Sequence, residues 1–113
     1  MTNAPTAAST AVVTTERPAR FGKQLVAHLG RHSGGEWSDD EGTGWISLGE
    51  ARAEVEARSE ALILRVYGPT DDLDDLEDVV GRHLVRFTRR GQVTVRWVRA
   101  DGRAGTEQRT QVD

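Results

Sequence analysis

Cysteine is absent from this chain, and its absence excludes several kinds of chemistry at once. The protein has no disulfide bond, no thiolate nucleophile, and no cysteine ligand for zinc or an iron–sulfur cluster. Any metal site must therefore use histidine, carboxylate or backbone oxygen. Long apolar runs are absent as well, since no stretch approaches the roughly 20 residues of a membrane-spanning helix. We therefore expect no membrane partner.

A surplus of positive charge is also missing. The net charge is -3 and the isoelectric point is about 5.6, whereas binding to nucleic acid needs a concentrated basic surface. We therefore expect no nucleic-acid partner. The N-terminal segment Met1–Thr15 has no basic residue before its small apolar run, unlike a secretory signal, which predicts a cytoplasmic protein.

The short motifs that mark common enzyme sites are absent too. The chain contains no His-Glu-x-x-His pair, no P-loop, no dinucleotide-binding glycine pattern and no GxSxG elbow. No side chain is an evident nucleophile, so we expect a non-catalytic protein. The remaining catalytic alternative is a small enzyme that uses His83 as its general base.

The most clearly specified element is a helix from Thr70 to Phe87. Its acidic residues come first and its arginines last, which is the charge order that the helix dipole favours. Thr70 is expected to cap the first turn. Apolar residues recur at helical spacing and predict one buried side, formed by Leu73, Leu76, Val80, Leu84 and Phe87.

The rest of the chain predicts a single small domain of the α+β class. A first strand at Thr10–Thr15 leads to a helix that begins near Pro18 and stops near Gly30. Alternating segments between residues 34 and 67 predict four short strands, and a last strand follows at Val93–Arg99. The expected order is β-α-β-β-β-β-α-β, a two-layer fold with a mainly antiparallel sheet and both helices on one face. The domain spans residues 10–100, and residues 1–9 and 101–113 are expected to be flexible tails.

Three histidines are the candidate metal ligands. Helical geometry places His28 and His83 where they approach each other if both helices share a sheet face, and His32 lies just beyond the first helix end. Three imidazoles suffice for a zinc or ferrous site with an open position. The alternative is that each imidazole sits at a helix–sheet boundary and bonds to backbone.

A basic cluster with an aromatic residue is the candidate ligand-binding site. Arginine suits bidentate contact with carboxylate or phosphate, and an indole ring adds stacking. The alternative is that these arginines complement the helix dipole and keep the last strand soluble, while Trp37 and Trp45 cover the core. The cluster consists of Arg82, Arg86, Arg89, Arg90, Arg96, Arg99 and Trp97.

Several motifs on the two helices carry a family resemblance. They are Arg17-Pro18-Ala19-Arg20-Phe21 with Lys23-Gln24-Leu25, His28 and His32, Glu36-Trp37, Val79-Val80, and His83-Leu84-x-Arg86-Phe87. From about Thr10 to Trp97 the chain resembles the bacterial family called domain of unknown function 2218. Similar domains occur beside or fused to siderophore-interacting flavin reductases, so the resemblance implies a link to iron acquisition. The segment Ser47-Leu48-Gly49 lacks the Phe-Pro-like run associated with the family.

The resemblance and the residues together give one leading hypothesis and one rival. The leading hypothesis is an accessory protein that binds iron, haem or a ferric siderophore, with His28, His32 and His83 as metal ligands. Its candidate ligand-binding residues are Arg20, Lys23, Arg86 and Trp97. The rival is a protein-interaction module that pairs in trans with a siderophore-interacting reductase or forms a homodimer.

Overall fold

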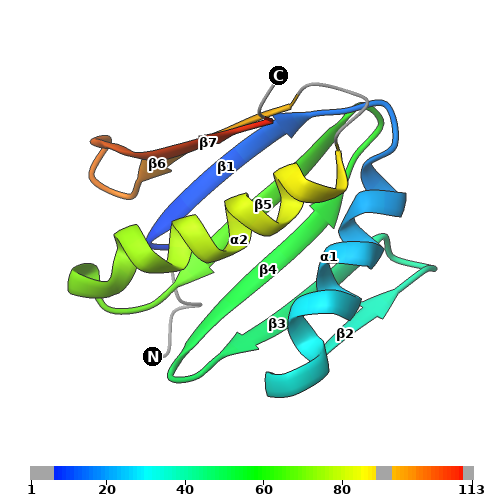
Figure 1. The fold of residues 1–113 in the computed structure, drawn as a ribbon, viewed down its shortest axis with the longest axis horizontal. Helices are drawn as coiled ribbons and strands as arrows, with labels where there is room; N and C mark the ends of the chain where they lie inside the picture. Colours follow the sequence, from blue (N-terminus) through cyan, green and yellow to red (C-terminus); the bar gives the residue numbers. More distant parts are fainter. Residues whose placement is uncertain (1–6, 89–92, 111–113) are drawn as a thin grey trace, which may run out of the picture.

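One seven-stranded sheet carries two helices on a single face (Figure 1). This computed structural model describes residues 7–88 and 93–110. Every neighbouring strand pair is antiparallel, which confirms the predicted α+β class. The helices are α1 (Pro18–Ser33) and α2 (Leu73–Phe87), and the strands are β1 (Ser9–Thr14), β2 (Gly35–Ser38), β3 (Thr43–Leu48), β4 (Ala51–Ala57), β5 (Ala61–Tyr67), β6 (Thr94–Arg99) and β7 (Ala104–Arg109).

The first strand of the chain lies inside the sheet rather than at its edge. The spatial order is β2-β3-β4-β5-β1-β6-β7, so β1 joins the four-strand meander to the β6–β7 hairpin. Ala11 and Val13 are buried toward the helices, whereas Val12 points to the other face and is 61% exposed. This alternation has the period of a strand with one face in the core.

Helix α2 packs on the sheet through the predicted stripe. Leu73, Val80 and Leu84 are buried, and Leu76 and Phe87 pack against the same core. The predicted cap at Thr70 is wrong, because Thr70 begins a 3-10 turn (Thr70–Asp72) without a side-chain cap bond. The first turn of α2 does carry acidic residues, as expected, and the helix dipole favours negative charge at this end.

Helix α1 continues past the glycine predicted to end it. Pro18 occupies the first turn as expected, but the helix runs to Ser33. Gly30 lies inside the helix, and its lack of a side chain lets β2 pass close by, since a Cβ there would lie 3.0 Å from the Cα of Gly35. The helix ends at Gly34, which has φ 102° and donates its N–H to the Gly30 carbonyl at 2.8 Å.

The segment expected to be a C-terminal tail contains a seventh strand. Strand β7 pairs with β6 through a turn at Gly102, where the Arg99 N–H donates to the Arg103 carbonyl at 2.8 Å. The tail prediction was wrong here because Ala104–Arg109 has no apolar alternation, and its strand state comes from backbone pairing with a neighbour. Residues 1–6 of the predicted N-terminal tail lie outside the described residues, whereas Ser9 already belongs to β1.

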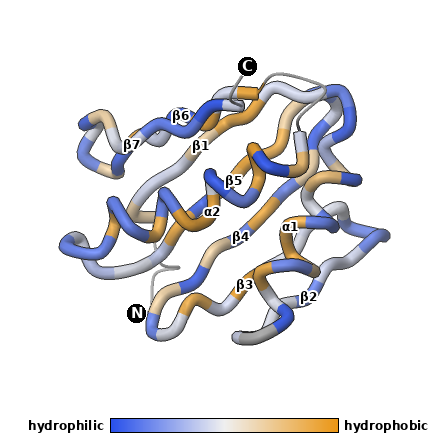
Figure 2. Tube along the Cα trace, in the orientation of Figure 1, coloured by the Kyte–Doolittle hydropathy of each residue, from blue (hydrophilic) through white to orange (hydrophobic). Residues whose placement is uncertain are grey.

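The two faces of the sheet differ in cover and polarity. Hydrophobic colour concentrates on the central strands and alternates with hydrophilic turns along both helices (Figure 2). The opposite face of the sheet carries no helix among the described residues and presents mainly charged and polar side chains. No helix in the described part of the chain is long and apolar enough to cross a bilayer.

Candidate functional site

Two of the three predicted histidines meet between the helices. The imidazole of His28 on α1 and that of His83 on α2 have ring centroids 5.1 Å apart, with 43° between the ring planes. Phe87, one turn after His83, meets the His28 ring edge-on at 5.5 Å. His28 is exposed and His83 is half-buried. The predicted approach of these two rings is confirmed, and their role as ligands stays a prediction.

A backbone hydrogen bond fixes the orientation of the His83 ring. Its Nδ1 lies 2.6 Å from the carbonyl oxygen of Val79, one turn earlier in α2. A carbonyl only accepts, so in the neutral ring Nδ1 carries the hydrogen and Nε2 keeps its lone pair. Histidine ligands in metal sites are commonly held this way by their second nitrogen. The nitrogen of His83 that this bond leaves free is therefore Nε2.

A complete metal site is not assembled by the described side chains. No group of three or more histidine, aspartate and glutamate residues that could hold a metal ion occurs among them. The third predicted ligand, His32, lies one turn after His28 in α1, but its side chain is outside the described part of the structure. The geometry thus supplies two imidazoles of the predicted three.

The predicted basic residues do not form one site with Trp97. Trp97 is 0% exposed, and its Nε1–H donates to Oε1 of Gln108 at 2.7 Å. This corrects the expectation that its ring is open for stacking on a ligand. The reason is strand parity, because Trp97 points into the core while Arg96 points to the other face and pairs with Glu107 at 3.2 Å.

The cationic side chains are dispersed over several surfaces. Arg20 and Lys23 are exposed on α1, and Lys23 pairs with Asp39 at 3.3 Å. Arg86 lines an open hollow of about 540 Å³ between α2 and β7, which also receives Arg82 and Arg109. Arg89 and Arg90 lie outside the described residues.

Sequence reasoning missed a buried carboxylate, Glu77, in the middle of α2. Its side chain is 0% exposed and accepts five hydrogen bonds. Ser9 of β1 donates at 2.5 Å, Arg99 of β6 at 3.0 and 3.2 Å, and the Thr106 N–H and hydroxyl of β7 at 2.8 and 2.9 Å. Burial raises the pKa of Glu77, but the bonds from Arg99, Ser9 and Thr106 outweigh it and bring the pKa below the usual value.

A signal for Glu77 exists in the sequence. It lies four residues after Leu73 and three before Val80, which places it on the apolar stripe of the helix. The sheet makes room for it through a bulge, since Arg96 pairs with Glu107 but Val98 pairs with Ala104, leaving Gly105 and Thr106 opposite one residue. Glu77 joins the helix to three strands, and its fully buried carboxylate is already occupied by five hydrogen bonds, so we assign it to stability rather than to a ligand site.

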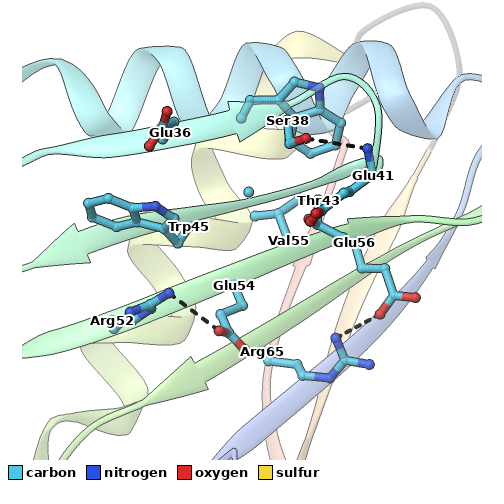
Figure 3. A pocket seen from close by; sticks show the side chains of 12 residues that line it. Glu36, Ser38, Glu41, Thr43, Trp45, Arg52, Glu54, Val55, Glu56 and Arg65 are labelled. Atoms are coloured by element: carbon cyan, nitrogen blue, oxygen red, sulfur yellow. Dashed lines mark hydrogen bonds and ion pairs between the residues drawn. The ribbon is translucent and has the colours of Figure 1, made fainter.

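A second candidate site is a groove on the uncovered face of the sheet, with a volume of about 600 Å³. Figure 3 shows Trp45 and Arg52 along this groove, with Arg52 reaching Glu54 and Arg65 reaching Glu56. The Arg52 guanidinium lies 5.2 Å from the centre of the Trp45 ring. Trp45 was expected to cover the core, but strand alternation places it on the other face.

The groove carries more carboxylates than arginines. Glu36, Glu41, Glu54 and Glu56 line it together with Arg52 and Arg65. Hydrogen bonds from Arg58 and Arg65 lower the pKa of Glu56. Burial and a hydrogen bond to Glu54 raise the pKa of Tyr67, whose hydroxyl donates to Glu54 at 2.7 Å. The lining of the groove is therefore polar, with a surplus of carboxylates.

Comparison with known proteins identifies a family. A similar solved structure is the NMR structure of PA4090 from Pseudomonas aeruginosa, with a TM-score of 0.61 and 29% sequence identity over 73% of this chain and 84% of that chain. No curated protein matches the chain. The model of a family described as an uncharacterized protein conserved in bacteria, domain of unknown function 2218, matches residues 10–98. The match spans both helices, the histidine pair and nearly all of strands β1 to β6 but not β7, and the chain belongs to this family of uncharacterised bacterial proteins.

Proposed function

We propose that this protein is a non-catalytic accessory protein that binds ferrous iron between α1 and α2 through His28 and His83. The observation that carries the proposal is the contact of the two rings at 5.1 Å, together with the bond that holds His83 Nδ1 on a backbone carbonyl. Imidazole nitrogen suits ferrous iron and other divalent transition metals. The choice of iron rests on the link to siderophore-interacting reductases that the family resemblance implies.

The residues fit a bare ion better than a haem. Two imidazoles with centroids 5.1 Å apart leave no space for a porphyrin between them, but one ion at the exposed rim of the helix pair could bind Nε2 of the fixed His83 ring and a nitrogen of the exposed His28 ring. The remaining coordination positions would be filled by His32, by water or by oxygen atoms of a chelator. Exposure of His28 leaves the ion open to exchange with such a chelator.

The test is a metal titration of the purified protein. Ferrous iron under anaerobic conditions, and cobalt(II) as a spectroscopic probe, are added while amide signals are followed by NMR. Selective broadening is expected near Val79 and Phe87, and the changes His28→Gln and His83→Gln should each weaken binding at least about tenfold. Arg82→Gln is the matched control, because Arg82 is exposed next to His83 in the chain and pairs with Asp78 at 2.7 Å.

Two outcomes would end this proposal. One is the absence of any metal-dependent change at millimolar cobalt(II) or iron(II). The other is binding of equal strength in the wild type and in the variant that carries both glutamine changes, since the metal would then be held elsewhere.

A second candidate function is favoured by the uncovered sheet face. We propose that its groove around Trp45 docks a protein partner, with a siderophore-interacting reductase as the first candidate. A pull-down with that reductase should survive His28→Ala with His83→Ala and should be lost with Trp45→Ala and Arg65→Glu. Retention by all of these variants would exclude the groove as the docking surface.

A further inference from the structure

Strand β7 forms an open edge of the sheet. It is the last strand in the order, and in the described part of the chain only β6 pairs with it. The side chains of Glu107 and Arg109 on this strand are exposed. The far edge, β2, has four residues, whereas β7 has six. An edge of this kind offers unpaired N–H and C=O groups to another strand.

The backbone hydrogen bonds show which residues of β7 direct their N–H and C=O groups toward the free edge of the sheet. The Thr110 N–H donates to the Val93 carbonyl at 3.1 Å, and Gln108 pairs with Val95 two residues along. In an antiparallel ladder the backbone N–H and C=O groups of every second residue point to the same neighbouring strand. Gln108 therefore bonds toward β6, and the N–H and C=O of Glu107 and Arg109 point to the free edge.

The charges of Glu107 and Arg109 favour one register over others if β7 pairs with β7 of a second copy. If Glu107 lies opposite Glu107 of a second copy, or Arg109 opposite Arg109, like charges meet and the pair is destabilised. If Gln108 lies opposite Gln108, Glu107 of each copy lies opposite Arg109 of the other. This register also brings the outward backbone groups together as hydrogen-bonded pairs.

We propose that this protein forms a homodimer by antiparallel pairing of β7 with β7 of a second copy, with Gln108 on the twofold axis. The interface is isologous, as in most dimers, and it continues the sheet across both copies with the helices on the same side. The two Glu107–Arg109 contacts lie on the uncovered face. The proposal does not depend on the histidine pair, which is on other elements.

Charge reversal gives a direct test by analytical ultracentrifugation over a concentration series. Glu107→Arg and Arg109→Glu should each weaken the dimer about tenfold or more, because both contacts become repulsive. A mixture of the two variants should associate again, because arginines of one copy then face glutamates of the other at both contacts. Arg31→Glu, a charge reversal at an exposed position on α1, is the control and should leave the dimer unchanged.

A second variant tests the backbone itself. Arg109→Pro removes one outward N–H without breaking the ladder to β6, so it should leave the circular dichroism spectrum unchanged and reduce dimer formation. A wild type that stays monomeric at all concentrations would overturn the proposal. So would a dimer that ignores both charge reversals, or variants that fail to associate when mixed.

Discussion

The buried carboxylate of Glu77 gives the sharpest prediction, through the change Glu77→Gln. Glutamine has nearly the same shape but no charge, and it places an NH₂ group where one carboxylate oxygen accepted bonds from Arg99, Ser9 or Thr106. The Arg99 side chain, which is 22% exposed, would keep Asp74 as its charged partner. Breaking a buried ion pair by removing one partner costs about 3 to 5 kcal/mol, and the partial exposure of Arg99 sets our expectation at about 3 kcal/mol.

The measurement is urea unfolding followed by circular dichroism at pH 7. A loss of about 3 kcal/mol is a large part of the roughly 5 to 15 kcal/mol by which a domain is stable, and it should lower the urea midpoint without changing the slope. Asp74→Asn is the matched control, because Asp74 bonds to the same arginine but is 75% exposed. It should cost less than about 1 kcal/mol. If Glu77→Gln costs no more than Asp74→Asn, the carboxylate is not what ties α2 to the strands.

Three further predictions concern the same part of the core. Because the folded-state pKa of Glu77 is lowered, the stabilisation by its carboxylate is present above the unfolded pKa of about 4.3 and is lost as pH falls through the folded pKa. The difference in unfolding free energy between the wild type and Glu77→Gln should therefore shrink below about pH 4. A constant difference in urea titrations at acid pH would contradict this. Gly105→Ala should destabilise by about 1 to 3 kcal/mol, because its Cβ would lie 2.5 Å from Glu77 Oε2 and 2.9 Å from Trp97 Cβ; an unchanged melting temperature would show that the bulge yields easily. Trp97→Phe should cost about 1 to 3 kcal/mol by leaving Gln108 without its buried donor, and it should leave metal binding unchanged; a loss of metal binding at unchanged stability would return Trp97 to the ligand site.

Helical periodicity predicted the layers of the fold, because it depends on which side of an element is buried. The stripe of Leu73, Val80 and Leu84 faces the sheet as expected, and the same reasoning brought His28 and His83 together. The periodicity of one element does not show which other element pairs with it. The central position of β1 and the existence of β7 follow from backbone pairing between distant segments, and pairing leaves little trace in the sequence Ala104–Arg109.

The candidate site was predicted only in part, because the face on which each side chain lies depends on the strand or helix that carries it. Trp97 and its neighbouring arginines are close in sequence, but strand alternation sends Trp97 and Arg96 to opposite faces. Trp45 likewise belongs to the uncovered face, where its neighbours Arg52 and Glu54 come from β4. Glu77 was overlooked because its acidic neighbours in α2 suggested a solvated helix start. Its spacing from Leu73, rather than its charge, predicts its burial.

The position of β1 affects how the protein can fold during its synthesis on the ribosome. Ser9 pairs with Val66 on one side and Arg99 on the other, so β1, which precedes the other strands of this sheet, needs partners from two later segments to complete its pairing. Until β6 has left the ribosome, β1 can complete only one of its two ladders. Contacts between such distant residues slow folding, and a nascent chain would expose one side of β1 or β5 to other strands in the meantime. Pairing with β6, which is made after the meander, closes the centre of this sheet.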